Sequence, residues 1–114
     1  MGVEKITTQP GTGAFPKAGQ TVIIEYTGYL RDEAAPNQKG AQFDSSVGRG
    51  DFETAIGVGR VIKGWDEGVT KMQVGEKATL VISSDFGYGS RGFPGHIPPA
   101  ADLIFDVWLK DIKN

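Results

Sequence analysis

Side chains that could do covalent or metal chemistry are scarce in this chain of 114 residues. It has no cysteine, which excludes disulfides, thiol nucleophiles and thiolate-bound zinc. Its one histidine, His96, lies in a Gly-His-Ile-Pro segment without an obvious acidic partner, and no Gly-x-Ser-x-Gly motif is present. Asp66 and Glu67 are neighbours on a predicted helix, so their side chains diverge. The sequence therefore predicts a site with no nucleophile, no metal and no cofactor.

Other classes of ligand and location are also disfavoured. Gly57-Val58-Gly59 begins like a dinucleotide-binding fingerprint, but Ile62 occupies the place of its third glycine. A formal net charge of −2 gives no reason to expect nucleic-acid binding. No apolar run approaches the length of a membrane span, the N-terminus has no signal-peptide core, and Ile6 breaks a myristoylation motif. We expect a cytosolic protein, with passive nuclear entry possible and no membrane partner.

Aromatic side chains are the remaining candidates for a functional site. Taken singly, each is typical of a hydrophobic core. Several, however, stand beside loop residues, where aromatic rings often wall a pocket and stay partly accessible. Both interpretations remain open from the residues alone; the set is Tyr26, Phe43, Phe52, Trp65, Tyr88, Phe93 and Phe105.

Segments with a two-residue period must position these rings. Residues 21–30, 77–83 and 102–112 alternate apolar and polar side chains and are rich in β-branched residues, which predicts strands. Residues 52–56 form a shorter candidate, and residues 3–8 a weaker one at an edge. Residues 62–71 instead repeat apolar side chains at helical spacing. Gly64 and Gly68 weaken that helix by about 1 kcal/mol each, so its Trp65 face must pack on the sheet.

Two long segments have neither period. Residues 31–42 contain Pro36, Asn37 and Gly40 and read as an exposed loop. Residues 85–101 are rich in glycine and proline but also hold Phe86, Tyr88, Phe93 and Ile97, so we expect this loop to fold over something apolar. The predicted architecture is α+β, with an antiparallel sheet of four to six strands and one short helix across one face. The absence of repeats and linkers predicts one domain over residues 1–114.

Six separated motifs occur in order along the chain: Phe43-Asp44-Ser45-Ser46, Val61 to Val69, Gly75-Glu76-Lys77-Ala78, Phe86-Gly87-Tyr88-Gly89, Ile97-Pro98-Pro99 and Leu103-Ile104-Phe105-Asp106-Val107. Together they resemble the FKBP immunophilins, a family of peptidyl-prolyl isomerases that bind tacrolimus and rapamycin. The resemblance runs from about Gly2 to the chain end and is greatest to single-domain cytosolic members. It implies a twisted sheet of five or six antiparallel strands wrapped around a short helix.

The resemblance also implies roles for individual residues. Trp65 is expected at the pocket floor, between walls formed by Tyr26, Phe43, Phe52 and Phe105. Val61 and Ile62 are expected at the rim, with the Ile62 N–H and the Tyr88 hydroxyl donating to carbonyl groups of the ligand. Asp44 is expected at the edge, near Arg49 and Tyr26. It either contacts the rotating carbonyl carbon or holds Tyr26 and Arg49, and we favour the second role. Phe93, His96 and Ile97 are expected in an overhanging loop.

Three features depart from the usual family pattern. Residues 31–42 are several residues longer than the tight hairpin of small members. Phe93 stands where many members have histidine, and His96 where an apolar residue is common. Arg60 replaces an acidic or amide residue. All three differences concern the rim or an adjoining surface, so they bear on substrate preference more than on basic activity.

The leading hypothesis is therefore an isomerase that acts on Xaa-Pro bonds in peptides and folding proteins. A monomer is expected, which in the drug-bound state captures calcineurin (with tacrolimus) or TOR kinase (with rapamycin). The alternative is a binding module whose aromatic pocket holds proline-containing segments or macrolides without useful catalysis. The two hypotheses differ in whether the protein accelerates exchange of a prolyl peptide.

Overall fold

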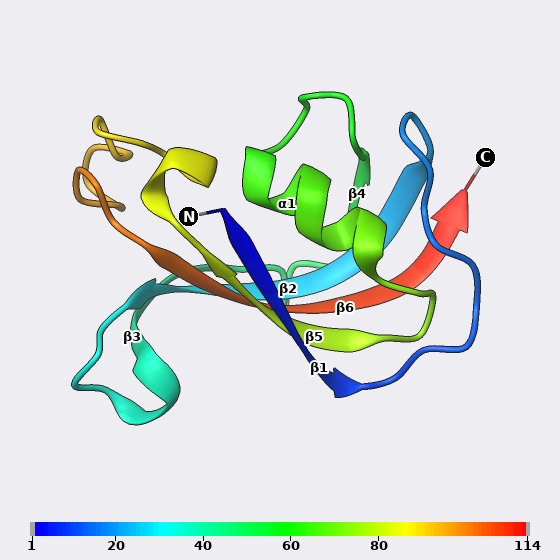
Figure 1. Cartoon of the computed structure of the whole chain (residues 1–114), viewed down its shortest axis with the longest axis horizontal. Helices are drawn as coiled ribbons and strands as arrows, with labels where there is room; N and C mark the ends of the chain where they lie inside the picture. Colours follow the sequence, from blue (N-terminus) through cyan, green and yellow to red (C-terminus); the bar gives the residue numbers. More distant parts are fainter. Residues whose placement is uncertain (1, 114) are drawn as a thin grey trace.

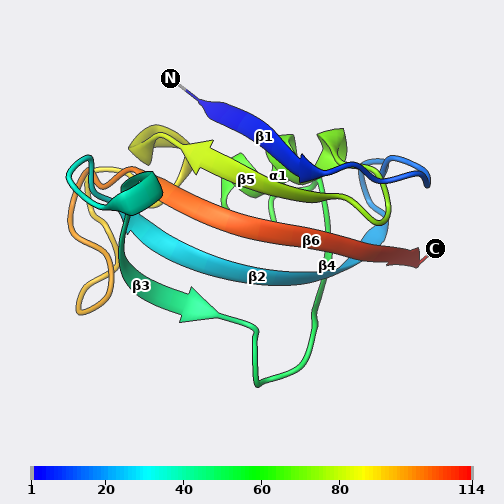
Figure 2. The ribbon, with the colours of Figure 1, turned by 90° about the horizontal axis from the view of Figure 1, so that it is seen from below.

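The computed structural model describes residues 2–113, and six strands in that range form one antiparallel sheet. The strand order is β1-β5-β6-β2-β3, and the short strand β4 pairs separately with β2 (Figures 1 and 2). The strands are β1 (Val3–Gln9), β2 (Thr21–Arg31), β3 (Lys39–Ser45), β4 (Phe52–Ala55), β5 (Lys77–Ile82) and β6 (Leu103–Lys113). The predicted α+β architecture is confirmed, with the number of strands at the upper end of the range.

One short helix, α1 (Lys63–Gly68), lies across one face of the sheet and continues into the 3-10 turn η2 (Val69–Lys71) (Figure 1). The predicted helix, residues 62–71, is correct in place but is α-helical for only six residues. Its glycines have a packing reason. A Cβ on Gly64 would lie 2.6 Å from Ile82 Cγ2, and one on Gly68 would lie 2.9 Å from Leu80 Cδ1. The glycines therefore let the helix approach β5 closely enough to bury Trp65 beneath it.

The core fills the space between α1 and the sheet. On β2, Val22, Ile24 and Tyr26 point inward, and the alternate residues are half-buried. β5 and β6 show the same alternation, as their sequences predict. The buried inward residues of these two strands are Ala78, Leu80, Ile82, Leu103, Phe105, Val107 and Leu109. The sheet face under α1 is therefore apolar along its length.

Residues 31–42 differ from the expected loop. Arg31 ends β2, a 3-10 turn η1 (Pro36–Gln38) follows, and Lys39 already begins β3. The prediction is wrong here because β3 is an edge strand with shifts in register against β2. Ala41 and Gln42 are exposed, so no alternation of apolar residues marks the strand.

Residues 85–101 are largely irregular, as predicted, apart from the end of the 3-10 turn η3 (Ser84–Phe86) and an isolated bridge between Phe93 and Ile97. Phe86 and Ile97 pack against the core, which confirms the expected apolar contact. Tyr88 and Phe93 instead remain at the surface. Within residues 2–113, no helix has the length and apolar character needed to cross a membrane.

Candidate functional site: an aromatic pocket at the start of the helix

A cavity of about 260 Å³ opens between the first turn of α1 and the inner face of the sheet. Each of the six elements β2, β3, β4, α1, β6 and the loop after η3 contributes a ring or a carboxylate to it. The segment that leads into α1 supplies the rest of the wall. The lining residues are Tyr26, Phe43, Asp44, Phe52, Arg60, Val61, Ile62, Trp65, Tyr88 and Phe105.

Trp65 lies at the centre of the aromatic contacts and is only 5% exposed. Its ring centroid is 4.8 Å from that of Tyr26, 5.2 Å from that of Phe105 and 5.8 Å from that of Phe52, all in edge-on geometry. Such edge-to-face pairs are favourable because ring edges are positive and ring faces negative. The Trp65 Nε1–H is buried without a hydrogen-bond partner in the described part of the chain. Ring contacts therefore hold the indole in place.

Asp44 connects the pocket edge to its wall. Its Oδ2 accepts a hydrogen bond of 2.7 Å from the Tyr26 hydroxyl, and its Oδ1 accepts one of 2.9 Å from Arg49 Nη2. Arg49 Nη2 also lies 3.4 Å from the Tyr26 oxygen. Burial, followed by the hydrogen bond and the charge of Asp44, raises the pKa of Tyr26 to about 12. Both Asp44 oxygens thus have protein donors, and Tyr26 stays a neutral donor.

Besides the buried Trp65 Nε1–H, the Ile62 N–H and the Tyr88 hydroxyl at the pocket also lack a protein acceptor in the described part of the chain. Among residues 2–113, the backbone N–H of Ile62 donates to none, although the Ile62 carbonyl accepts from the N–H groups of Trp65 and Asp66. The Tyr88 hydroxyl likewise makes no hydrogen bond to a described residue, and Tyr88 is 39% exposed. Burial and the negative charge of Asp44 raise the pKa of Tyr88, so the hydroxyl keeps its proton at neutral pH. These two donors are available to a ligand.

The turn before α1 is held by a carboxylate that the sequence did not identify as part of the site. Asp66 accepts hydrogen bonds from the N–H groups of Gly57, at 2.7 Å, and Gly59, at 2.9 Å. Both glycines have positive φ, 79° and 81°, which other residues adopt only with strain. Asp66 therefore fixes the turn that carries Arg60 to the pocket rim. The sequence signal was the pair of glycines upstream of an acidic helix residue.

Four predicted binding residues, Arg49, Phe93, His96 and Ile97, lie outside this cavity. Phe93, His96 and Ile97 line a neighbouring hollow of about 200 Å³, which shares Phe43, Asp44 and Tyr88 with the pocket. Here Phe93 stacks between Tyr88 and His96, with ring centroids 6.0 and 5.0 Å away. Arg49 lines neither cavity and reaches the pocket only through Asp44 and Tyr26. The remaining predicted site residues all line the pocket itself.

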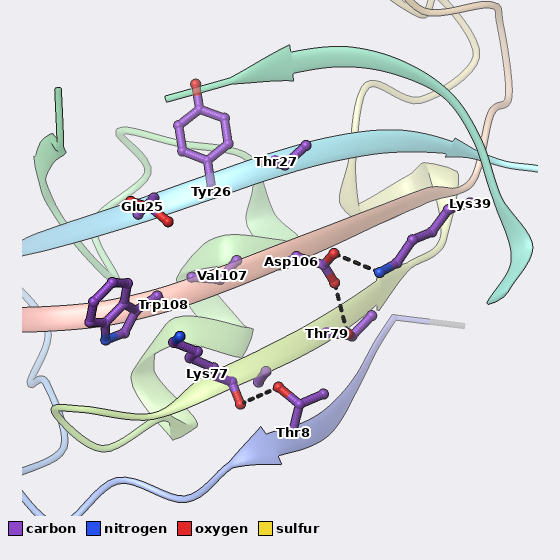
Figure 3. Close-up of a pocket in the computed structure, with 11 residues that line it drawn as sticks. Thr8, Glu25, Tyr26, Thr27, Lys39, Lys77, Thr79, Asp106, Val107 and Trp108 are labelled. Atoms are coloured by element: carbon purple, nitrogen blue, oxygen red, sulfur yellow. Dashed lines mark hydrogen bonds and ion pairs between the residues drawn. The ribbon is translucent and has the colours of Figure 1, made fainter. Parts of the chain in front are cut away.

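The opposite face of the sheet bears a separate hollow of about 340 Å³, drawn in Figure 3. Its four charged lining residues already have partners within the protein. Lys39 Nζ lies 2.6 Å from Asp106 Oδ2, and Thr79 donates to Asp106 Oδ1 (Figure 3). Lys77 and Lys110 each lie 4.5 Å from the Trp108 ring centroid. Across the described residues, no cluster of three or more His, Asp or Glu side chains is placed to hold a metal ion.

Comparison with known proteins identifies the family. The profile of the family described as FKBP-type peptidyl-prolyl cis-trans isomerase matches residues 12–110. The chain is 70% identical to FK506-binding protein 1B of Neurospora crassa over 113 residues, which are 99% of this chain and 100% of the relative. It is 64% identical to FK506-binding protein 1 of Gibberella zeae over 112 residues, covering 98% of this chain and 99% of the relative.

A third relative carries the activity in its name. The chain is 53% identical over 116 residues to the peptidyl-prolyl cis-trans isomerase of Schizosaccharomyces pombe, which covers 100% of this chain and 97% of the relative. The family profile and all three relatives span the segments that line the aromatic pocket. The chain therefore belongs to the FKBP-type family of peptidyl-prolyl cis-trans isomerases, and it is a rotamase.

Proposed function

We propose that the pocket over Trp65 is the isomerase site and that it turns Xaa-Pro bonds in peptides and folding proteins without a cofactor. One observation carries this assignment: an aromatic floor and two free hydrogen-bond donors, Ile62 N–H and Tyr88 O–H, meet in a single cavity. The proline ring packs on Trp65, and Tyr26, Phe43, Phe52 and Phe105 enclose it.

The chemistry follows from the electronic structure of the amide. Resonance between nitrogen and carbonyl keeps the bond planar and creates a barrier of about 18–20 kcal/mol to rotation. The twisted transition state has lost that resonance and carries less charge separation than the planar amide. A water-poor aromatic pocket therefore favours the transition state relative to the ground state, and no nucleophile is required.

Hydrogen bonds supply the positioning. Ile62 N–H and Tyr88 O–H hold carbonyl groups that flank the prolyl bond, so that only this bond turns. Asp44 acts as a positioning residue. Its two oxygens hold Tyr26 and Arg49, and this pairing supports the structural role over direct contact with the rotating carbonyl carbon.

The same pocket is proposed to bind tacrolimus (FK506) and rapamycin. Two of the relatives are named for binding FK506, and their similarity covers nearly the whole chain. With a macrolide bound, the adjoining surface of Phe93, His96 and Ile97 is proposed to contact calcineurin or TOR kinase. Residues 1–114 are proposed to act as one monomeric domain in the cytoplasm, with passive entry into the nucleus.

The two tryptophans provide a matched test. Exchange between the cis and trans forms of a short Xaa-Pro peptide is followed by NMR with catalytic amounts of protein. We expect the wild-type protein to accelerate exchange, Trp65→Leu to lose at least about tenfold in kcat/KM, and Trp108→Leu to retain full activity because Trp108 lies on the other sheet face. Equal loss in both variants would reject the pocket assignment.

The competing function is capture of proline-containing segments without catalysis. Saturable binding of the peptide by the wild-type protein, with no change in exchange rate, would establish it. The same experiment with rapamycin added tests the drug site. Rapamycin at stoichiometric concentration is expected to abolish the acceleration, since both ligands occupy the cavity over Trp65.

A further inference from the structure

Arg60 is the one charged residue of the pocket lining that has no partner among residues 2–113. The cavity has two charged lining residues, Asp44 and Arg60. The charge of Asp44 is balanced by Arg49, whose Nη2 is 2.9 Å from Asp44 Oδ1. The exposed Arg60 guanidinium makes no hydrogen bond and no ion pair in the described part of the chain. The rim therefore carries a guanidinium that no described carboxylate pairs with.

The charged side chains nearest to Arg60 in the helix that follows make contacts with other groups. The Asp66 carboxylate, six residues on, is turned toward the N–H groups of Gly57 and Gly59. The Lys63 ammonium lies over the Phe86 ring, 4.6 Å from its centroid. Neither group pairs with Arg60. Ligand binding thus has to break no ion pair in order to engage this guanidinium.

The backbone of Arg60 is fixed beside the proposed ligand donors. Asp66 holds the turn through Gly57 and Gly59, and Ile62, which supplies the free N–H, follows Arg60 by two residues. A peptide carbonyl bound at Ile62 places the flanking residues of that peptide along the rim. A long arginine side chain is then within reach of a side chain next to the proline or one residue further.

Guanidinium groups bind carboxylates through paired charge-assisted hydrogen bonds. We infer that Arg60 is a specificity-determining residue, which selects Xaa-Pro substrates that carry an Asp or Glu side chain within two residues of the proline. This inference rests on the proposed location of the isomerase site. It adds a substrate class, acidic prolyl segments, that the aromatic floor alone does not distinguish.

The test uses a set of three peptides, with Glu, Gln or Lys as the only difference, at each of the four positions within two residues of the proline. For at least one position we expect the wild-type protein to show kcat/KM about threefold higher for the Glu peptide than for the Gln peptide, and lower still for the Lys peptide. The preference should fade between about 0.01 M and about 1 M salt, because the pair is exposed to solvent.

Variants of the protein test whether the preference for the Glu peptide comes from Arg60. Arg60→Gln should bring the Glu to Gln ratio to about one, and Arg60→Glu should reverse the order so that the Lys peptide is best. Lys71→Gln is the matched control. It removes one positive charge from an exposed residue at the far end of the helical segment, and the preference should persist. A ratio near one in the wild-type protein at every position, or an unchanged ratio in Arg60→Gln, would overturn the inference.

A second measurement separates this inference from the assignment of the site. The dissociation constant of each peptide is obtained from the NMR shift of the Ile62 amide. Equal acceleration of all peptides by the wild-type protein would reject only the role of Arg60. No acceleration of any peptide would reject the isomerase site. In that case tighter binding of the Glu peptide, lost in Arg60→Gln, would still support the role of Arg60, and equal binding would reject it.

Discussion

The two faces of the sheet are built by the same strands and have opposite chemistry. On β2 and β6, Tyr26 and Phe105 point toward α1, while Glu25 and Asp106 point to the other side. The inner face is apolar, its aromatic rings gather around the pocket, and the polar groups of the pocket lie at its edge. On the outer face Asp106 pairs with Lys39 (Figure 3), and Lys110 lies near Glu25 and Asp51.

The difference shows which face of the sheet is able to bind a ligand. A ligand at the outer face would have to displace existing ion pairs, whereas the inner pocket presents unused donors and ring surface. The period of two along a strand is enough to separate these environments. Changes to the inner face should therefore affect both stability and catalysis, and changes to the outer face should have little effect on either.

The largest loss in the free energy of unfolding is expected for Phe105→Ala. Phe105 is 3% exposed, and its ring contacts those of Phe43, Trp65 and Tyr26. Truncation should lower the free energy of unfolding by about 3–5 kcal/mol through lost burial and a residual cavity. Urea unfolding followed by circular dichroism measures this loss. A cost below about 1 kcal/mol would mean that the inner face is not the tightly packed one.

The second largest loss of stability is expected for a substitution of Gly28, where the inner face has no side chain. Gly28 lies between Phe43 and Phe105, and an added Cβ would stand 2.8 Å from Phe43 Cζ and 2.7 Å from Phe105 Cε2. Gly28→Ala should therefore destabilise the fold by about 1–3 kcal/mol and displace both pocket rings, which lowers kcat/KM. The measurements are urea unfolding and NMR exchange.

A double-mutant cycle supplies the control for Gly28. Phe43→Leu in the Gly28→Ala background should recover part of the lost stability, because the smaller side chain makes room for the methyl group. Additive losses in the double variant would show that crowding against Phe43 is not the cause.

A smaller effect is expected at the edge of the inner face, for Tyr26→Phe. Loss of the 2.7 Å hydrogen bond to Asp44 should cost about 0.5–1.5 kcal/mol at neutral pH. The pKa of Tyr26 is raised from 10.0 to about 12 in the folded protein. The folded state therefore binds the phenol proton more tightly than the unfolded chain, so this contribution is present below pH 10.0 and is lost as pH rises toward 12.

The stability difference between wild type and Tyr26→Phe should accordingly shrink between about pH 9 and about pH 12. Urea unfolding at several pH values measures the difference. Subtraction of the variant removes the contribution of other groups that titrate in this range. A difference that grows with pH would contradict the neutral, Asp44-bound state of Tyr26.

How far the sequence predicts the fold depends on which faces are buried. β2, β5 and β6 could be located to within a residue or two because each has one strictly apolar face. β3 could not, because Lys39 to Gln42 lie at an edge and bury no alternating side chain. Its pairing with β2 is a tertiary property that local pattern does not contain. The helix was found from its spacing but ends early as an α-helix, since η2 tightens its last turn.

The candidate site likewise has parts that the sequence predicts and parts that it does not. The floor and walls, including Trp65 and Phe105, were predicted through the family motifs, and the structure brings them into one cavity. The role of Asp66 was missed, because it depends on the positive φ of Gly57 and Gly59. The separation of Phe93 and His96 into a second hollow depends on the bridge between Phe93 and Ile97. Both features depend on hydrogen bonds between residues four to nine positions apart, which a pattern of apolar residues does not register.

The smallest effect is expected on the outer face, for Asp106→Asn. Asp106 accepts from Lys39 at 2.6 Å and from Thr79 at 2.8 Å, but its side chain is 39% exposed. Solvent-exposed ion pairs contribute about 1 kcal/mol or less, so the free energy of unfolding should fall by no more than that. Its neighbour Phe105, on the inner face, should cost several times as much.

Catalysis provides the sharper test of the outer face. Exchange of a prolyl peptide should proceed at the wild-type rate in Asp106→Asn and in Lys39→Gln, because neither residue lines the pocket. The double variant should be no less stable than the less stable single one, since both substitutions remove the same ion pair. A fall in kcat/KM in either variant would show that the two faces communicate through β6, and the separation drawn between them would fail.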